Sequence, residues 1–494
     1  MLFKSTRSTQ QATESAAQVI KQGLANDGGL FVPESIPALT EEEIKVLCGD
    51  SYPVRAAKIL SKFLGDYTYE ELLEDCEKAY SESSFVGGAA PMVNIHDNLE
   101  SLELWHGPTA AFKDMALQIM PRLLSRALVK TGEKRTALIL VATSGDTGKA
   151  ALEGYKDVDG IKIMVFYPVD GVSRVQKLQM ATQTGSNVNV CAIRGNFDDA
   201  QNGVKAIFGD KAMADALNEK GYFFSSANSI NWGRLAPQIV YYVSAYCDLL
   251  NAGKCKMGDS FNVCVPTGNF GNIFAAYLAK LMGLPIGKLI CASNSNNILT
   301  DFLRTGTYDR NRDFYLTMSP SMDILISSNL ERLLYFVAGS EKTAAYMEDL
   351  KNKGVYSVEP EVLAEIQKNF IGYYTDEKET AATIKATFEK YNYLADTHTA
   401  VAIHAAEAYI AESGDKAPMV IDSTASPYKF ANNVYLAVAG KDAPSELEAL
   451  DELEKATNTK IPYPLSGLAE RKVNFTKTVD KSEMANAVLE YLNA

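Results

Sequence analysis

The sequence predicts an α/β fold built around a mostly parallel sheet. From about residue 102, short apolar segments with strand character alternate with longer segments of helical apolar spacing. Loops rich in glycine, serine and threonine directly follow several of the strand-like segments, which is where open α/β sheets bind ligands. We therefore expect helices on both faces of the sheet and a site at the carboxyl ends of its strands.

The expected strands are short and mostly apolar. They are residues 136–142, 161–167, 187–193, 260–265, 288–292 and, much later, 419–422. Apolar spacing predicts helices at 41–48, 53–63, 115–124, 173–184, 198–220, 231–251, 273–282 and 481–492. The alternation of both types predicts βαβ units.

Changes of pattern along the chain predict five units. Residues 1–95 form an N-terminal helical region, 96–300 an α/β core and 301–390 a helix-rich insertion, while 391–440 return to the core and 441–494 form a C-terminal cap.

Composition excludes several classes of protein. The net charge of −13 argues against nucleic-acid binding. No apolar stretch is long enough for a membrane span, and the first residues lack the apolar core of a signal peptide. Seven scattered cysteines without a CxxC pair fit reduced thiols and predict a cytoplasmic location. The four histidines have no metal-ligand spacing, so no metal site is expected.

One lysine lies at a loop-to-helix junction. Residues 105–112 read Trp-His-Gly-Pro-Thr-Ala-Ala-Phe, and the turn of this segment ends at Lys113. Asp114 can cap the following helix, and Pro121 would bend it. A desolvated lysine loses its proton readily and becomes a nucleophile. Taken alone, a solvated surface lysine is the more ordinary interpretation.

A polar loop follows the expected strand 136–142. Backbone N–H groups and the hydroxyls of Thr143, Ser144 and Thr147 are suited to hold a carboxylate. The alternative of a nucleotide P-loop fails, because that motif needs glycine at Thr143 and a hydroxyl at Ala150. A generic strand-to-helix turn stays open for this loop alone.

A second loop, residues 266–272, reads Pro-Thr-Gly-Asn-Phe-Gly-Asn between a strand and a helix. Two glycines three positions apart let backbone N–H groups converge, and the helix dipole favours an anion there. The loop is a candidate phosphate cradle, although glycines at such turns also arise from packing.

A third loop follows the late strand. Thr424 and Ser426 offer neutral hydrogen bonds to a heterocyclic ring nitrogen, and Asp422 offers a charged one. We assign the ring nitrogen to Thr424 and leave Asp422 as the alternative. A capped turn is the ordinary interpretation of this loop on its own.

Together these segments supply an amine, a phosphate cradle, a carboxylate loop and a ring-nitrogen partner, which is the set that pyridoxal 5′-phosphate (PLP) needs. Their order resembles the fold type II (tryptophan synthase β-like) PLP enzymes and, within them, the threonine synthase family. The resemblance spans nearly the whole chain and is carried by residues 23–33, 106–109, 112–114, 143–148, 225–234 and 268–272. Two departures are Ser426 in place of an expected histidine and Thr397 in place of an expected proline, while Thr424 and His398 match.

The resemblance implies two sheet-containing subdomains and a set of site residues. Lys113 would hold PLP as a Schiff base and be the catalytic base. The other cofactor-binding residues would be Phe112, Asp146, Gly268, Asn269, Phe270, Gly271, Asn272 and Thr424. The substrate-binding residues would be Thr143, Ser144, Thr147, Ser226, Asn228, Asn231 and Arg234, with Arg234 as the bidentate phosphate donor.

The resemblance also implies an activity, the conversion of O-phospho-L-homoserine and water to L-threonine and phosphate, a PLP-dependent lyase reaction with β,γ-replacement. The expected partner is this small molecule, with neither nucleic acid nor membrane, in a monomer or homodimer. One alternative is another fold type II PLP lyase such as a threonine or serine dehydratase. Another is a PLP-binding homologue that has lost catalysis.

Overall fold

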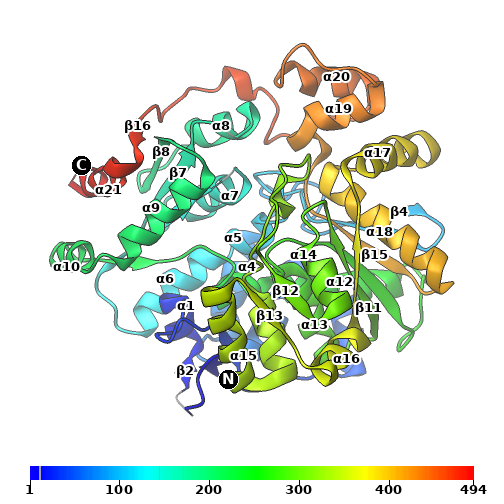
Figure 1. Ribbon diagram of the computed structural model, residues 1–494, viewed down its shortest axis with the longest axis horizontal. Coiled ribbons are helices and arrows are strands. Elements are labelled where there is room, and N and C mark those ends of the chain that lie inside the picture. The colour runs from blue at the N-terminus through cyan, green and yellow to red at the C-terminus, as the bar shows by residue number, and fades with distance from the viewer. Residues whose placement is uncertain (11–12, 144, 171, 494) are drawn as a thin grey trace.

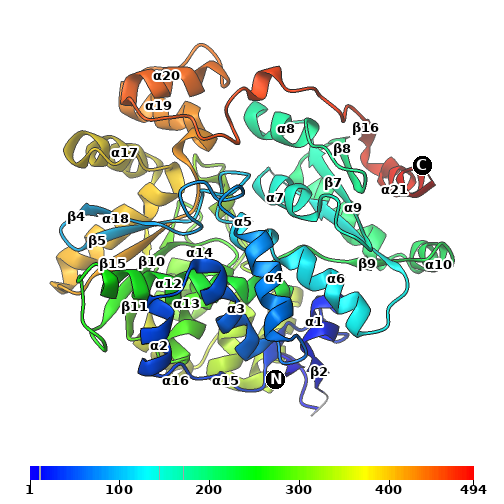
Figure 2. The ribbon, with the colours of Figure 1, turned by 180° about the vertical axis from the view of Figure 1, so that it is seen from behind.

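The computed structural model describes residues 1–10, 13–143, 145–170 and 172–493 and contains two large, mostly parallel sheets (Figures 1 and 2). The α/β class that the sequence predicts is confirmed. Within these ranges, no helix is both long and apolar enough to cross a membrane.

The smaller of the two large sheets has five strands in the order β16-β8-β7-β6-β9, all parallel. Its strands are β6 (Thr136–Ala142), β7 (Ile161–Pro168), β8 (Val188–Arg194), β9 (Tyr222–Ser225) and β16 (Thr478–Asp480). The helices that follow its strands or pack beside them are α7 (Asp146–Tyr155), α8 (Arg174–Ala181), α9 (Phe197–Gly209), α10 (Lys211–Glu219) and the C-terminal α21 (Met484–Asn493) after η4 (Lys481–Glu483).

The larger sheet has the order β14-β11-β10-β15-β5-β4, and only its β4–β5 pair is antiparallel. Its strands are β4 (Met92–His96), β5 (Leu99–Glu103), β10 (Phe261–Pro266), β11 (Ile286–Ser293), β14 (Phe370–Tyr374) and β15 (Met419–Ser423). The helices associated with this sheet are α12 (Pro237–Asn251), α13 (Gly271–Leu281), α14 (Ile298–Thr305), α16 (Pro360–Asn369), α17 (Glu377–Tyr391) and α18 (Thr397–Ser413).

The N-terminal region adds a three-stranded sheet and four helices. These elements are β1 (Leu2–Ser5), β2 (Glu14–Ser15), β3 (Phe31–Pro33), α1 (Ala16–Gln22), α2 (Glu41–Cys48), α3 (Tyr52–Phe63) and α4 (Tyr69–Ala79). Capping fixes where two of the helices begin. Thr40 and Glu43 form a reciprocal capping box at α2, and Thr68 and Glu71 form another at α4.

The remaining elements join these units. They are α5 (Asp114–Leu117), α6 (Met120–Lys130), α11 (Trp232–Leu235), β12 (Thr307–Asp309), η1 (Pro320–Met322), α15 (Leu330–Lys353), β13 (Val355–Ser357), η2 (Pro427–Phe430), α19 (Ala431–Ala439), α20 (Glu448–Thr457) and η3 (Leu468–Glu470). Both views place α5 between the two large sheets (Figures 1 and 2). The site therefore forms at the junction of the two sheet-containing parts.

Three expected helices are interrupted, each for a local reason. The helix expected over 198–220 is two helices, because the side chain of Asp210 accepts backbone hydrogen bonds that begin a second one. Pro237 similarly begins α12 after the short α11. The helix expected from residue 115 breaks before Met120, and Pro121 lies in the first turn of α6 rather than at a bend.

The sequence pattern does not indicate β4, β5 or β9 of the two large sheets, and two further segments also contribute unexpected strands. The helix-rich segment 301–390 contains β14, which pairs in parallel with β11 at the edge of the larger sheet. The C-terminal segment contains β16, which pairs with β8 and extends the smaller sheet. Both strands are short, so their periodicity is weak. The five domain bounds themselves stay predictions.

Candidate active site

The lysine segment is a tight loop held by a buried carboxylate. Asp114 lies at the first position of α5, and its carboxylate accepts hydrogen bonds from the backbone N–H (2.8 Å) and hydroxyl (2.7 Å) of Thr109. A side chain at Gly107 would come within 2.6 Å of Asp114. Asp114 therefore closes the preceding loop and is not the helix cap that the sequence suggests. That position belongs to Lys113, without a side-chain hydrogen bond.

Lys113 places its amine among buried polar and charged side chains. Its Nζ lies 3.9 Å from Oδ2 of Asp146 and 4.9 Å from the centroid of the Phe112 ring. Burial lowers the pKa of Lys113 to about 8, with Asp146 opposing this shift and the cations Arg234 and Lys429 adding to it. Near neutral pH a useful fraction of this amine is unprotonated, as a nucleophile or base requires.

The loop after β6 brings Asp146 to the lysine. The hydroxyl of Thr143 accepts hydrogen bonds from the N–H groups of Gly145 and Gly148, both at 2.9 Å, and shapes the turn. Thr147 lies half-buried in the first turn of α7. The predicted residue Ser144 lies outside the described residues.

The carboxylate of Asp146 has several hydrogen-bond and ion-pair partners in the site. Its Oδ1 accepts from Nε2 of Gln176 at 2.8 Å and lies 3.1 Å from Nζ of Lys429, while its Oδ2 accepts from the hydroxyl of Ser321 at 3.0 Å. Burial alone would raise the pKa of Asp146, but Lys429 and Lys113 bring it below its ordinary value. Asp146 is therefore ionised.

The glycine loop after β10 leads into α13. Phe270 has φ 66°, and its ring packs in the core 5.6 Å from that of Phe370, so it offers the site only its backbone. A side chain at Gly268 would meet the carbonyl of Ser321 at 2.8 Å. Packing thus explains this glycine. The N–H groups of residues 268–272 meet no protein acceptor within the described ranges. They remain available to an anion.

The two asparagines of the 266–272 loop differ in their environment. The side chain of Asn269 is exposed. Asn272 is buried, and its Nδ2 donates to the carbonyl of Pro266 at 3.2 Å. The side chain of Asn272 therefore supports the loop, and its contribution to a ligand would come from the backbone.

The segment from Ser226 to Arg234 is ordered around Asn231. Asn231 is fully buried; its Oδ1 accepts from the N–H of Gly233 and its Nδ2 donates to the carbonyl of Ile20. The hydroxyl of Ser226 accepts from the N–H of Asn228. Asn231 is a predicted substrate residue, but its side-chain amide already forms hydrogen bonds with the protein backbone.

Arg234 is buried and lacks a carboxylate partner in the described part of the chain. Its Nη1 donates to the carbonyl of Ala227 at 2.9 Å, and burial lowers its pKa to about 10, where it is still a cation at neutral pH. An ordinary ion pair with a surface carboxylate therefore does not account for Arg234 within the described residues. Buried charges need partners, so this guanidinium is suited to an anionic ligand.

The end of β15 carries two candidate partners for a ring nitrogen. Oδ2 of Asp422 accepts from the hydroxyl of Tyr242 at 2.6 Å, while its buried Oδ1 has no partner among the described residues. Burial raises the pKa of Asp422 to about 7. Thr424 lies against the lysine segment, where its carbonyl accepts from the N–H of Phe112 at 2.8 Å.

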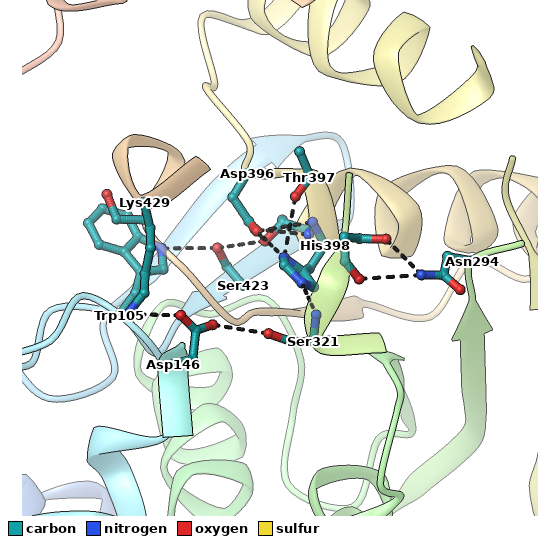
Figure 3. Close-up of polar contacts among 12 residues, drawn as sticks. Trp105, Asp146, Asn294, Ser321, Asp396, Thr397, His398, Ser423 and Lys429 are labelled. Carbon is teal, nitrogen blue, oxygen red and sulfur yellow. Dashed lines mark hydrogen bonds and ion pairs between the residues drawn. The ribbon is translucent and has the colours of Figure 1, made fainter. Parts of the chain in front are cut away.

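A polar network connects the site to helix α18 (Figure 3). The N–H of Ser321 donates to Nε2 of His398 at 3.1 Å, and Nδ1 of His398 lies 2.7 Å from Oδ2 of Asp396. Because Nε2 accepts a hydrogen bond, the ring proton lies on Nδ1 and is donated to Asp396. The network holds Ser321 beside Asp146.

Sequence reasoning missed three side chains that contact Asp146, namely Gln176, Ser321 and Lys429. None has a local signal of its own, because each lies on an element far from Asp146 in sequence. Lys429 follows the serine-rich turn after β15, and this position was the one indication in the sequence that it could belong to the site.

The buried polar groups fit PLP. Lys113 offers an amine without a hydrogen bond to the described residues, the loop 268–272 offers free N–H groups, and Asp422 has an oxygen without a partner. No group of three or more potential metal ligands occurs within the described residues.

Family models match three consecutive parts of the chain. Residues 2–80 match the model described as threonine synthase N terminus, residues 102–422 that of pyridoxal-phosphate dependent enzymes, and residues 399–487 that of the threonine synthase C-terminal part.

Curated relatives and solved structures agree with these models. The chain is 41% identical over 86% of its length to human threonine synthase-like 1, of which it spans 58%. It is 39% identical to a threonine synthase of Pseudomonas aeruginosa, covering 94% of this chain and 97% of that one. The PLP-bound threonine synthase of Brucella melitensis matches over the full length of both chains with a TM-score of 0.88 and 37% identity. The chain therefore belongs to the threonine synthase family of pyridoxal-phosphate dependent enzymes.

Proposed function

We propose that this chain is a threonine synthase that converts O-phospho-L-homoserine and water to L-threonine and phosphate. The matches to threonine synthases of nearly the same length support this activity. The arrangement around Lys113 supports it independently, because it combines a deprotonatable amine with a buried anion site. We expect a cytoplasmic monomer or homodimer.

Lys113 would hold PLP covalently, beside Phe112 and Asp146. The N–H groups of residues 268–272, at the start of the eleven-residue helix α13, would bind the cofactor phosphate. The hydroxyl of Thr424 would form a hydrogen bond with the ring nitrogen. Asp422 is the alternative partner for this nitrogen. Bound PLP would supply an electron-accepting ring that stabilises negative charge at the α carbon of an amino acid.

The observation that carries the proposal is the buried guanidinium of Arg234. It lies close enough to Lys113 to lower the pKa of that amine, and no carboxylate neutralises it within the described ranges. The phosphate group of the substrate carries the negative charge that is missing beside Arg234. A guanidinium binds phosphate with two parallel hydrogen bonds. Ser226 and Asn228, on the same segment, would complete the phosphate site.

Lys113 would also move protons. When its amine is not bound to the cofactor, Lys113 would act at the α carbon of the substrate. With a pKa near 8 it can accept the α proton and later return a proton to the substrate. Asp146, held by Gln176 and Ser321, would supply a negative charge beside this amine.

The substrate carboxylate would bind at the start of α7. A helix start favours an anion, and Thr147 lies in the first turn of this helix. Thr143 accepts two backbone hydrogen bonds through its oxygen, so its hydroxyl proton is still available as a donor. Ser144, between them in sequence, would be the third hydroxyl.

Product analysis tests the proposal. The purified, PLP-loaded chain is incubated with O-phospho-L-homoserine, and phosphate and L-threonine are measured together. Equal amounts of both support threonine synthase. A 2-oxoacid with ammonia from threonine or serine would instead identify a dehydratase. Cofactor absorbance without any phosphate release would identify a non-catalytic homologue.

A further inference from the structure

Lys429 is a fully buried lysine at the centre of the site. It lies on η2, directly after β15, and its side chain has no exposed surface. Its Nζ lies 3.1 Å from Oδ1 of Asp146 (Figure 3). The same Nζ donates to the carbonyl of Thr109 at 2.8 Å. A buried ammonium needs a charged partner, and Asp146 is the one that Lys429 has among the described residues.

Asp146 is therefore shared between two lysines. The contact with Lys429 is an ion pair at 3.1 Å, whereas the amine of Lys113 lies 3.9 Å from the other oxygen, beyond hydrogen-bonding distance. That oxygen already accepts from Ser321. One carboxylate cannot neutralise two buried ammonium groups, so Lys113, which has fewer partners, loses its proton more readily than an ordinary lysine.

Burial has the largest effect on the pKa of Lys113, and other charges act on it beside those of Asp146 and Lys429. Arg234 on α11 adds a further positive charge, and Asp114 on α5 adds a negative one. The carboxylate of Asp114 is bound by Thr109 and has no direct contact with the Lys113 amine. Among the charges around the amine, Asp146 on α7 and Lys429 on η2 pair directly with each other, so a change at Lys429 reaches Lys113 through Asp146 as well as directly.

We propose that Lys429 is a positioning residue that occupies Asp146 and thereby makes the amine of Lys113 easier to deprotonate and able to capture the cofactor. This inference rests on the proposed role of Lys113. It adds a residue that acts on Lys113 through Asp146, without contact with substrate.

Removing the Lys429 charge has two effects of the same sign. The nearby positive charge disappears, and Asp146 is left with Lys113 as its cationic partner. Both favour protonated Lys113. A nearby charge in a buried site typically shifts a pKa by about 1–3 units. In Lys429→Met, the pKa of Lys113 is expected to rise by about one unit or more, and its amine to react roughly tenfold more slowly at pH 7.

The test is competitive labelling of the full-length chain after removal of PLP. Acetic anhydride is applied over a range of pH, and mass spectrometry measures acetylation of the peptide that contains Lys113. The wild type is expected to show a midpoint near pH 8, and Lys429→Met a midpoint at least about one unit higher. The same midpoint in both proteins would overturn the inference.

Four further variants separate charge from structure. Lys429→Arg keeps the charge and is expected to keep the wild-type midpoint. Asp146→Asn removes the shared carboxylate, so it is expected to lower the midpoint and to do so also in combination with Lys429→Met. Lys429→Gln is a second neutral variant that can still donate to Asp146, and its midpoint is also expected to rise; an unchanged midpoint there would overturn the inference even if Lys429→Met does not fold. The matched control is Lys149→Met, since Lys149 is buried on α7 but pairs with Glu153; it should leave the midpoint unchanged.

The PLP-loaded chain distinguishes failure of this inference from failure of the proposed function. If Lys113 holds the cofactor, loading with PLP protects it from acetylation. Unprotected Lys113 in the loaded chain would contradict its proposed role. Protection together with an unchanged midpoint in Lys429→Met would contradict the inference alone.

Discussion

Nδ2 of Asn231 donates a hydrogen bond to the backbone carbonyl of Ile20 at 2.8 Å and so fastens the proposed phosphate segment to helix α1. The same amide nitrogen would lie 3.2 Å from a side chain at Gly23, which ends α1 with φ 77°. The N-terminal region therefore contributes to the site although none of its own side chains has a proposed role in binding. It fixes the segment from which Arg234 projects.

Asn231→Ala is expected to destabilise the chain and to weaken substrate binding indirectly. It leaves the carbonyl of Ile20 and the N–H of Gly233 without their partner, at a cost of about 1–3 kcal/mol in the free energy of unfolding. Urea unfolding of the PLP-loaded variant measures this cost. A variant with unchanged stability and a raised KM would show instead that Asn231 contacts the substrate directly.

Arg234→Ala is expected to raise the KM for O-phospho-L-homoserine by roughly 10- to 100-fold, as the loss of a charged hydrogen-bond pair of about 1.5–3 kcal/mol implies. Arg234→Lys should recover part of the affinity, because it restores the charge but not the planar fork. Arg194→Ala is the control, since Arg194 is exposed on the smaller sheet and pairs with Asp480. Unchanged steady-state kinetics in Arg234→Ala would remove Arg234 from the phosphate site.

Sequence periodicity predicted the longer helices and strands, and the order of the motifs along the chain predicted which loops would form the site. It could not predict the short strands β14 and β16, whose few residues are positioned by pairing with distant strands. The sequence also could not distinguish residues that bind a ligand from residues that hold the loops of the site in place. Asn231 lies in a motif but is engaged by Ile20, while Lys429 looks like an ordinary surface lysine and is buried against Asp146. Both distinctions depend on tertiary contacts.

Lys113→Ala is expected to abolish the visible absorbance of bound PLP and all turnover. In the wild type, borohydride reduction should attach the cofactor permanently to the peptide that contains Lys113. Lys149→Met, the buried lysine that pairs with Glu153, should keep the absorbance. Borohydride labelling of a different lysine in the wild type would refute this assignment.

Asp422 makes the stability of the PLP-free chain depend on pH. Its folded pKa of about 7 lies above the ordinary value of 3.8, so between these values the folded chain binds more protons than the unfolded chain. The free energy of unfolding therefore falls as pH rises through this window, by up to about 1.4 kcal/mol per pH unit from this group. Asp422→Asn should remove this component, while the hydrogen bond with Tyr242 can persist.

Thr424→Val distinguishes the two candidates for the ring nitrogen. If Thr424 is the partner, the valine variant should change the visible spectrum of bound PLP, because the hydroxyl that faces the ring is lost, and should leave the pH dependence of the PLP-free chain intact. Asp422→Asn should then do the reverse. Spectra of the loaded variants and urea unfolding of the unloaded ones, each at pH 5 and pH 7, measure both effects. A spectral change confined to Asp422→Asn would assign the ring nitrogen to Asp422, whose Oδ1 is otherwise the buried oxygen left without a partner in the described part of the site.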